Sequence, residues 1–176
     1  MKKLLIKKMN LLDNRFNKKK YYFIKKNFIY PFIIIILIFF LDRYTKIQIL
    51  NNYDDSTIYL NYFINFDLIW NTGIGFGLFS YNSSLIYSLF TLVIGIVLLY
   101  LIYISINSEL IDTMIFSIII GGALGNFYDR LIFNAVPDFI DLHYMNYHWF
   151  TFNVADIFIS IGIISFLLKG FFNKKK

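Results

Sequence analysis

Four long apolar stretches, separated by more polar segments, dominate the pattern of the chain. They run from about Phe28 past Phe40 toward Leu50, from Leu85 to Ile106, from about Thr113 to Tyr128, and from about Val154 to Phe172. A helix needs roughly 20 apolar residues to cross a bilayer, and the second stretch is uncharged and of that length. The pattern predicts an all-α membrane protein, a four-transmembrane-helix bundle.

Composition and charge support this prediction. The 176 residues are 58% hydrophobic, with a mean hydropathy of +0.59, which is too apolar for an ordinary soluble domain of this length. Ten Lys or Arg lie in the first 26 residues and four more close the chain, whereas Arg130 is the single basic residue between Lys46 and Lys169. Basic ends around an apolar body are typical of two cytoplasmic termini, not of a nucleic-acid-binding face.

We therefore expect three parts: a basic cytoplasmic tail (1–26), a membrane domain (27–172) and a short basic tail (173–176). The leader suits contact with anionic lipid. Phe28 to Leu41 could also be the core of a cleaved signal peptide, but no small-x-small site follows, and Asp42-Arg43 stands there instead. A retained helix is the better interpretation.

Two outward segments are expected between the spans. Ile58 to Trp70 is rich in β-forming residues and predicts one or two short strands, a small outward-facing β-element. Asn71 to Gly77 follows, with glycines at alternate positions that allow either a flexible loop or a close approach of the backbone. The second segment holds Asp138 and Asp141, which we expect on a loop after Pro137.

Several polar residues occur at helical spacing near the ends of the spans. Carboxylates at membrane depth cost roughly 2.5–3.5 kcal/mol each, so they are usually kept for a role. Asp42 and Lys46 could form a local ion pair or lock the bundle, and Gly121 and Gly125 have the small-xxx-small spacing of tight helix packing.

The other polar positions each allow a structural and a functional interpretation. Arg130 could pair with Asp129, anchor a lipid headgroup or contact a substrate. Asn153 and Asp156 fit the N-cap and first turn of the last helix, which does not exclude catalysis.

Metal chemistry has little support. The chain has no Cys, which excludes disulfides, a cysteine nucleophile and thiolate ligands. His143 and His148 are more typical of a loop or an interface than of a metal site. We expect no metal and no organic cofactor.

Five blocks together resemble lipoprotein signal peptidase, also called signal peptidase II, an aspartic peptidase family (A8). In chain order they are Asp42-Arg43-Tyr44-Thr45-Lys46, Asn71 to Gly77, Gly121 to Arg130, Val136 to Ile140, and Phe152 to Asp156. Arg43 stands where the family often has Gln, and Pro137 where it often has Val.

The resemblance implies a four-helix enzyme of the bacterial inner membrane with its active site facing the periplasm or cell exterior. It implies cleavage of prolipoproteins before the diacylglyceryl-modified cysteine of the lipobox, and we expect a monomer. The family's residues map by role onto this chain: catalytic Asp138 and Asp156; substrate-binding Asn71, Asn126, Arg130 and Asn153; structural Asp42 and Asp129.

Two other functions are considered. A small ion-coupled transporter subunit would use Asp42, Asp129 and Asp156 as proton relays, but most acids lie at the outward boundary. A different intramembrane aspartyl protease lacks support because its Gly-x-Gly-Asp motif is absent. The dyad hypothesis requires Asp138 and Asp156 to come close together, sharing one proton.

Overall fold

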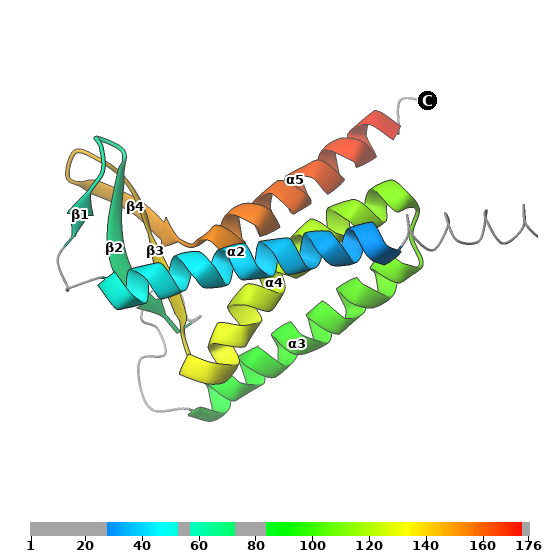
Figure 1. The fold of residues 1–176 in the computed structure, drawn as a ribbon, viewed down its shortest axis with the longest axis horizontal. Coiled ribbons are helices and arrows are strands. Elements are labelled where there is room, and N and C mark those ends of the chain that lie inside the picture. The colour runs from blue at the N-terminus through cyan, green and yellow to red at the C-terminus, as the bar shows by residue number, and fades with distance from the viewer. Residues whose placement is uncertain (1–27, 53–56, 73–83, 174–176) are drawn as a thin grey trace, which may run out of the picture.

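Four long helices follow one another in the computed structural model, which describes residues 28–52, 57–72 and 84–173 (Figure 1). They are α2 (Tyr30–Asn52), α3 (Ser84–Ile106), α4 (Leu110–Phe133) and α5 (Val154–Asn173). Each lies at one of the four apolar stretches, as predicted. The basic tail 1–26, residues 73–83 with their glycines and residues 174–176 lie outside the described ranges.

Three of the described helices are long and apolar enough to cross a membrane: Tyr87–Ile106, Leu110–Phe133 and Val154–Phe172. The chain is therefore a multi-pass membrane protein by length and composition. Helix α2 is also 23 residues long, but it carries Asp42, Arg43 and Lys46, all buried. A fourth span through α2 stays a prediction.

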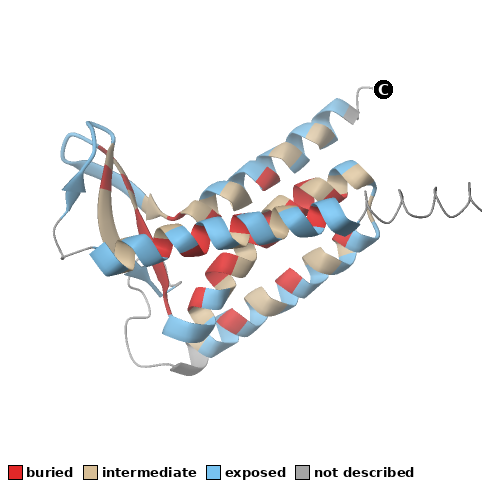
Figure 2. Cartoon of the chain, viewed as in Figure 1, coloured by how far each residue is buried: buried red, intermediate tan, exposed pale blue. Residues whose placement is uncertain are grey.

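Helix α4 is the centre of the bundle and packs against α2, α3 and α5 (Figure 1). Its buried Phe116, Ile119 and Ile120 form an apolar cluster with Leu98 of α3. The outer faces of the helices are largely exposed (Figure 2). Exposed apolar faces of this kind suit contact with lipid chains, which are as apolar as leucine.

Glycines of α4 allow this close packing. A Cβ added at Gly121 would lie 2.9 Å from Cβ of Ile38, and one at Gly125 would meet the carboxylate of Asp42. Both neighbours belong to α2, so the predicted small-xxx-small contact is confirmed. Gly122 faces the other way, toward α5.

Gly122→Ala is expected to destabilise the bundle by about 1–3 kcal/mol, the usual effect of overpacking. The added Cβ would lie 2.5 Å from the backbone oxygen of Ala155, and this contact can only be relieved by moving α5. Gly170→Ala is the matched control, because nothing lies within 4 Å of its Cβ position. Unfolding in detergent micelles measures both; equal effects would contradict the packing argument.

An antiparallel sheet lies at one end of the bundle, with strand order β1-β2-β3-β4. The strands are β1 (Ile58–Tyr59), β2 (Ile64–Asn71), β3 (Val136–Tyr144) and β4 (Tyr147–Phe152). Strands β1 and β2 confirm the prediction for the first outward segment. The predicted small β-element is thus a four-stranded sheet.

The prediction that Asp138 and Asp141 lie on a loop is wrong, because both belong to β3. This strand pairs with β2 on one side and β4 on the other. Pro137 is tolerated because it stands near the start of the strand, where a missing N–H does least harm. Residue Asn153 alone connects β4 to α5. Because β3 pairs with β4, this short connection places β3 near the start of α5.

Candidate active site

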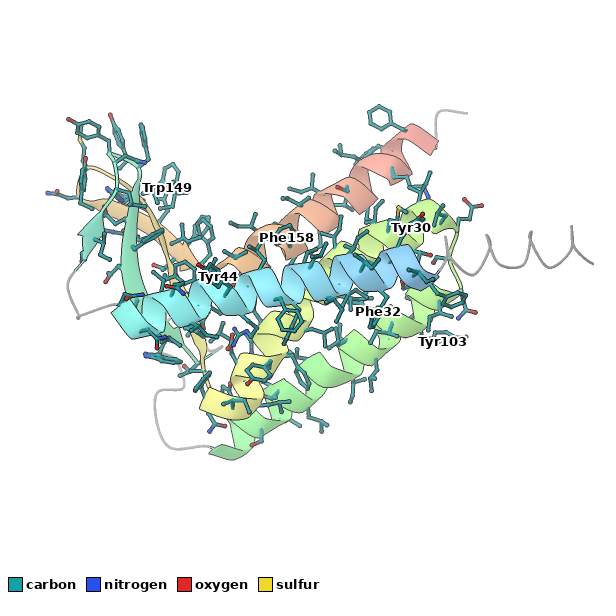
Figure 3. All side chains as sticks on the ribbon, in the orientation of Figure 1. Tyr30, Phe32, Tyr44, Tyr103, Trp149 and Phe158 are labelled. Carbon is teal, nitrogen blue, oxygen red and sulfur yellow. The ribbon has the colours of Figure 1, made fainter. Side chains whose placement is uncertain are left out.

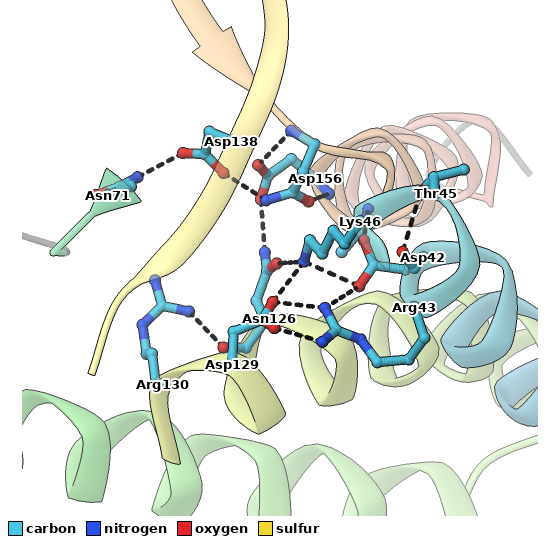
Figure 4. Close-up of polar contacts among 12 residues, drawn as sticks. Asp42, Arg43, Thr45, Lys46, Asn71, Asn126, Asp129, Arg130, Asp138 and Asp156 are labelled. Carbon is cyan, nitrogen blue, oxygen red and sulfur yellow. Dashed lines mark hydrogen bonds and ion pairs between the residues drawn. The ribbon is translucent and has the colours of Figure 1, made fainter. Parts of the chain in front are cut away.

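Asp138 of β3 and Asp156 of α5 both form hydrogen bonds with one residue, Asn153 (Figure 4). The Asn153 side-chain oxygen accepts the backbone N–H of Asp156 at 3.1 Å, and Asp156 Oδ2 accepts the backbone N–H of Asn153 at 3.1 Å. This is a capping box, so the predicted N-cap is confirmed. The Asn153 amide NH₂ therefore faces Asp138 and donates to Oδ1 at 2.5 Å.

Each of the two carboxyls accepts a further amide N–H. Asn71 of β2 donates to Asp138 Oδ2 at 2.8 Å, and Asn126 of α4 donates to Asp156 Oδ1 at 2.7 Å. Four elements thus converge on the pair: β2, β3, α4 and α5. Three of the residues expected to bind substrate, the asparagines, hold the two carboxyls in this structure, and their contact with substrate stays a prediction.

The environment of Asp138 changes its acidity. The residue is only 3% exposed, and burial raises the pKa of its carboxyl to about 6. The hydrogen bond from Asn71 acts in the opposite direction, whereas the negative charge of Asp156 adds to the rise in pKa. A carboxyl tuned in this way can hold or exchange a proton near neutral pH, as a general acid or base must.

Beneath the pair lies a buried cluster of two acids and two bases: Asp42, Arg43, Lys46 and Asp129 (Figure 4). Lys46 Nζ donates to Asp42 Oδ2 at 2.9 Å and to Asp129 Oδ2 at 2.7 Å. Arg43 contacts both oxygens of Asp129. The formal charges of the four side chains cancel, as buried charges require.

The cluster is tied to the carboxyl pair by two contacts. Asp42 Oδ1 accepts the backbone N–H of Ala155, one of the unpaired donors at the start of α5, at 3.0 Å. The third donor of Lys46 goes to the side-chain oxygen of Asn126 at 2.8 Å. Lys46 can only donate, so the Asn126 NH₂ is turned toward Asp156.

These contacts confirm the predicted Asp42–Lys46 ion pair. The supporting roles expected for Asp42 and Asp129 stay predictions. Sequence reasoning missed Arg43, which stands out in the sequence only as a difference from the family pattern. The available signal was its position beside Asp42, inside a largely apolar helix.

In the described ranges, Asp129 pairs with Arg43 and Lys46 rather than with Arg130. The guanidinium of Arg130 donates to the backbone oxygen of Asn126 at 3.1 Å. Arg130 also lines a cavity of about 640 Å³ between α3 and α4, together with apolar residues such as Leu92 and Phe127.

A second polar group lies on the sheet, away from the carboxyl pair. His148 Nδ1 lies 2.7 Å from Asp141 Oδ2, and the rings of His143 and His148 stack with centroids 5.5 Å apart. In the described ranges, no three or more His, Cys, Asp or Glu residues form a group that could hold a metal ion.

The chain is similar to known proteins. A family described as "Signal peptidase (SPase) II" matches residues 34–172, which include the cluster and the carboxyl pair. The chain belongs to the signal peptidase II family. It is therefore a peptidase, of family A8.

Relatives and solved structures agree with this membership. The chain is 48% identical to a lipoprotein signal peptidase of Pelagibacter ubique, over 86% of this chain and 93% of the relative. It is 40% identical to a lipoprotein signal peptidase of Francisella tularensis subsp. novicida, over 82% and 93%. A bacterial membrane enzyme solved by the in meso method at 1.9 Å resolution superposes with a TM-score of 0.71 and 26% identity, covering 81% of this chain and 92% of that one.

Proposed function

We propose that the chain is a membrane aspartic endopeptidase that removes signal peptides from prolipoproteins, cutting before the diacylglyceryl-modified cysteine of the lipobox. The carrying observation is that Asp138 and Asp156 both bind Asn153, one on each side of its amide. The names of the relatives support this substrate class.

In the proposed mechanism, the pair shares one proton, and Asp138, whose pKa burial raises to about 6, holds it. Asp156 is the ionised partner: it removes a proton from a water molecule, which attacks the scissile carbonyl. Asp138 donates a hydrogen bond to the carbonyl oxygen, stabilising the charge that develops there. No metal or organic cofactor enters this scheme.

The substrate would be held largely through its lipid. The cavity between α3 and α4 has a mainly apolar lining and a volume suited to an acyl chain. Arg130, on the same lining, would face the polar part of the substrate. The peptide near the cleavage site would meet Asn71, Asn126 and Asn153 around the carboxyls.

We further propose an orientation in the bacterial inner membrane. Helix α2 begins and α5 ends at the same end of the bundle, and the sheet lies at the opposite end (Figure 1). The basic termini favour the cytoplasmic side. The carboxyl pair would then face the periplasm or cell exterior, in a chain that acts as a monomer.

A cleavage assay with purified protein in lipid vesicles tests this function. A prolipoprotein bearing the diacylglyceryl group should be cut, whereas the same precursor without lipid should be cut much more slowly, because the apolar binding surface would stay empty. Equal cleavage rates for the two precursors would instead favour a different intramembrane aspartyl protease. No cleavage of either precursor would overturn the proposal.

The pH dependence follows from the pKa of Asp138. Above about pH 6 its carboxyl loses the shared proton and can no longer donate a hydrogen bond to the scissile carbonyl, so kcat/KM should fall between roughly pH 6 and pH 8. The apparent value belongs to the pair rather than to one residue. A pH–rate profile of the vesicle-bound enzyme checks this, and kcat/KM that rises or stays level over this interval would contradict the assignment of the shared proton to Asp138.

A further inference from the structure

The sheet extends beyond the helix bundle, and the extending part is rich in exposed aromatic side chains. Its strands run across the end of the bundle, and the hairpin of β3 and β4 projects past the start of α5 (Figure 1). The face of the sheet on which these aromatic side chains lie determines what can cover them.

The alternation of side chains along a strand shows which face of the sheet the aromatic residues occupy. Residues of a strand alternate between faces, so Asp138, Ile140, Leu142 and Tyr144 share one face of β3. Because Asp138 binds Asn153 at the start of α5, this face looks toward the helices.

The partners across the ladder in β4 share that face. Ile140 pairs with Phe152, Leu142 with Phe150 and Tyr144 with Tyr147. Trp149 stands at the register shift and packs its ring edge-on against Tyr147, with centroids 6.4 Å apart. In Figure 3 it extends on the side of the sheet where α5 lies. We call Tyr144, Tyr147, Trp149, Phe150 and Phe152 the aromatic face.

The aromatic face is exposed and carries no charge. Tyr144, Tyr147, Trp149 and Phe150 are 51%, 66%, 61% and 59% exposed. No Asp, Glu, Lys or Arg occurs from residue 142 to residue 153. Exposed apolar patches of this kind mark contact with a membrane or a partner.

The apolar surface continues onto a membrane-spanning helix. Only Asn153 separates Phe152 from α5, and Ile157, Ile161 and Ile164 form an exposed apolar stripe along that helix. Tyr and Trp have an apolar ring and a polar end, which suits the boundary between lipid chains and water. The lack of charged side chains on this face disfavours recognition of a polar protein surface.

We infer that the aromatic face lies in the interfacial zone of the outer lipid leaflet, beside α5. Contact there would hold β3, and with it Asp138, at the level of the headgroups. The occupant is the bilayer itself, rather than a second copy of the chain or the peptide of a substrate. This inference concerns how the sheet is held and does not require the proposed activity.

Tryptophan quenching in the full chain tests the inference. The protein has two Trp, so Trp70→Phe leaves Trp149 as the sole emitter. In phosphatidylcholine vesicles without substrate, lipids brominated on the upper part of the acyl chain should quench Trp149 strongly, since interfacial side chains lie about 5–10 Å into the headgroup and acyl boundary. Aqueous iodide should quench it weakly.

A matched pair of substitutions sharpens the test. In the Trp70→Phe background, Phe150→Asp should reduce quenching by brominated lipid and shift Trp149 emission to longer wavelength, whereas Phe150→Leu should change neither. Strong iodide quenching with no effect of brominated lipid would overturn the inference. So would protection that appears only at high protein density in the vesicles or only after a lipidated precursor is added, because those results identify a second copy or the substrate as the occupant.

Discussion

Asp138→Asn and Asp156→Asn are each expected to reduce cleavage of a lipidated precursor by about 10²–10⁴-fold, the usual contribution of a general acid or base. An amide has nearly the shape of a carboxyl but cannot take a proton from water or share one with its neighbour. The rate should be measured on purified variants in vesicles, with the precursor at saturating and at low concentration.

The reason for this large loss is the position of the pair. Each of the two carboxyls accepts one N–H on each oxygen, so an amide at either position keeps one of these contacts and turns its NH₂ toward the other donor. The loss of activity should appear in kcat, and the free energy of unfolding should fall only by about 1–3 kcal/mol, the usual result of leaving one buried donor unpaired.

Asp141→Asn is the matched control on the same strand. Asp141 is as buried as Asp138, at 2% against 3% exposure, but its partners are His143 and His148 rather than the pair. We expect a clearly smaller loss of activity. Full activity in Asp138→Asn or Asp156→Asn, or an equal loss in Asp141→Asn, would contradict the proposal that Asp138 and Asp156 are the catalytic pair.

Lys46→Met is expected to lower the free energy of unfolding by about 3–5 kcal/mol, the usual result of breaking a buried ion network. Lys46 is fully buried and holds Asp42, Asp129 and Asn126 with its three donors. Removing it leaves two buried carboxylates beside Arg43 alone. Reversible unfolding in mixed micelles measures the change.

Two further variants identify the cause. Lys46→Met combined with Asp129→Asn restores neutrality around Asp42 and Arg43, so it should be more stable than the two separate effects predict. Lys169→Met removes a partly exposed partner of Asp112 and should cost no more than about 1 kcal/mol. A similar small effect for Lys46→Met would mean that the cluster does not stabilise the bundle.

The helices could be predicted because their signal is local. Long apolar runs around Ile35, Leu98, Ile119 and Ile161 need no partner to be recognised, and spacing alone placed Asn153 and Asp156 at a helix start. The Gly121 and Gly125 contact was also predictable, since small residues four apart lie on one face of a helix.

Strand β3 could not be predicted in the same way. Pro137, Asp138 and Asp141 are poor strand formers in isolation. They form a strand because β2 and β4 pair with it on both sides, and β2 lies more than 60 residues away along the chain. A segment whose conformation depends on distant partners gives little local signal.

The sequence by itself determined the apolar helices, the basic ends, the capped start of α5 and the order of the polar blocks, because each depends on residues close together in the chain. Only the tertiary structure decided that Arg43 completes a neutral buried cluster and that Asn126 is turned from Lys46 toward Asp156. These contacts join residues 30 to 86 positions apart. Burial then decides their strength, because a charge removed from water must find its partner elsewhere in the fold.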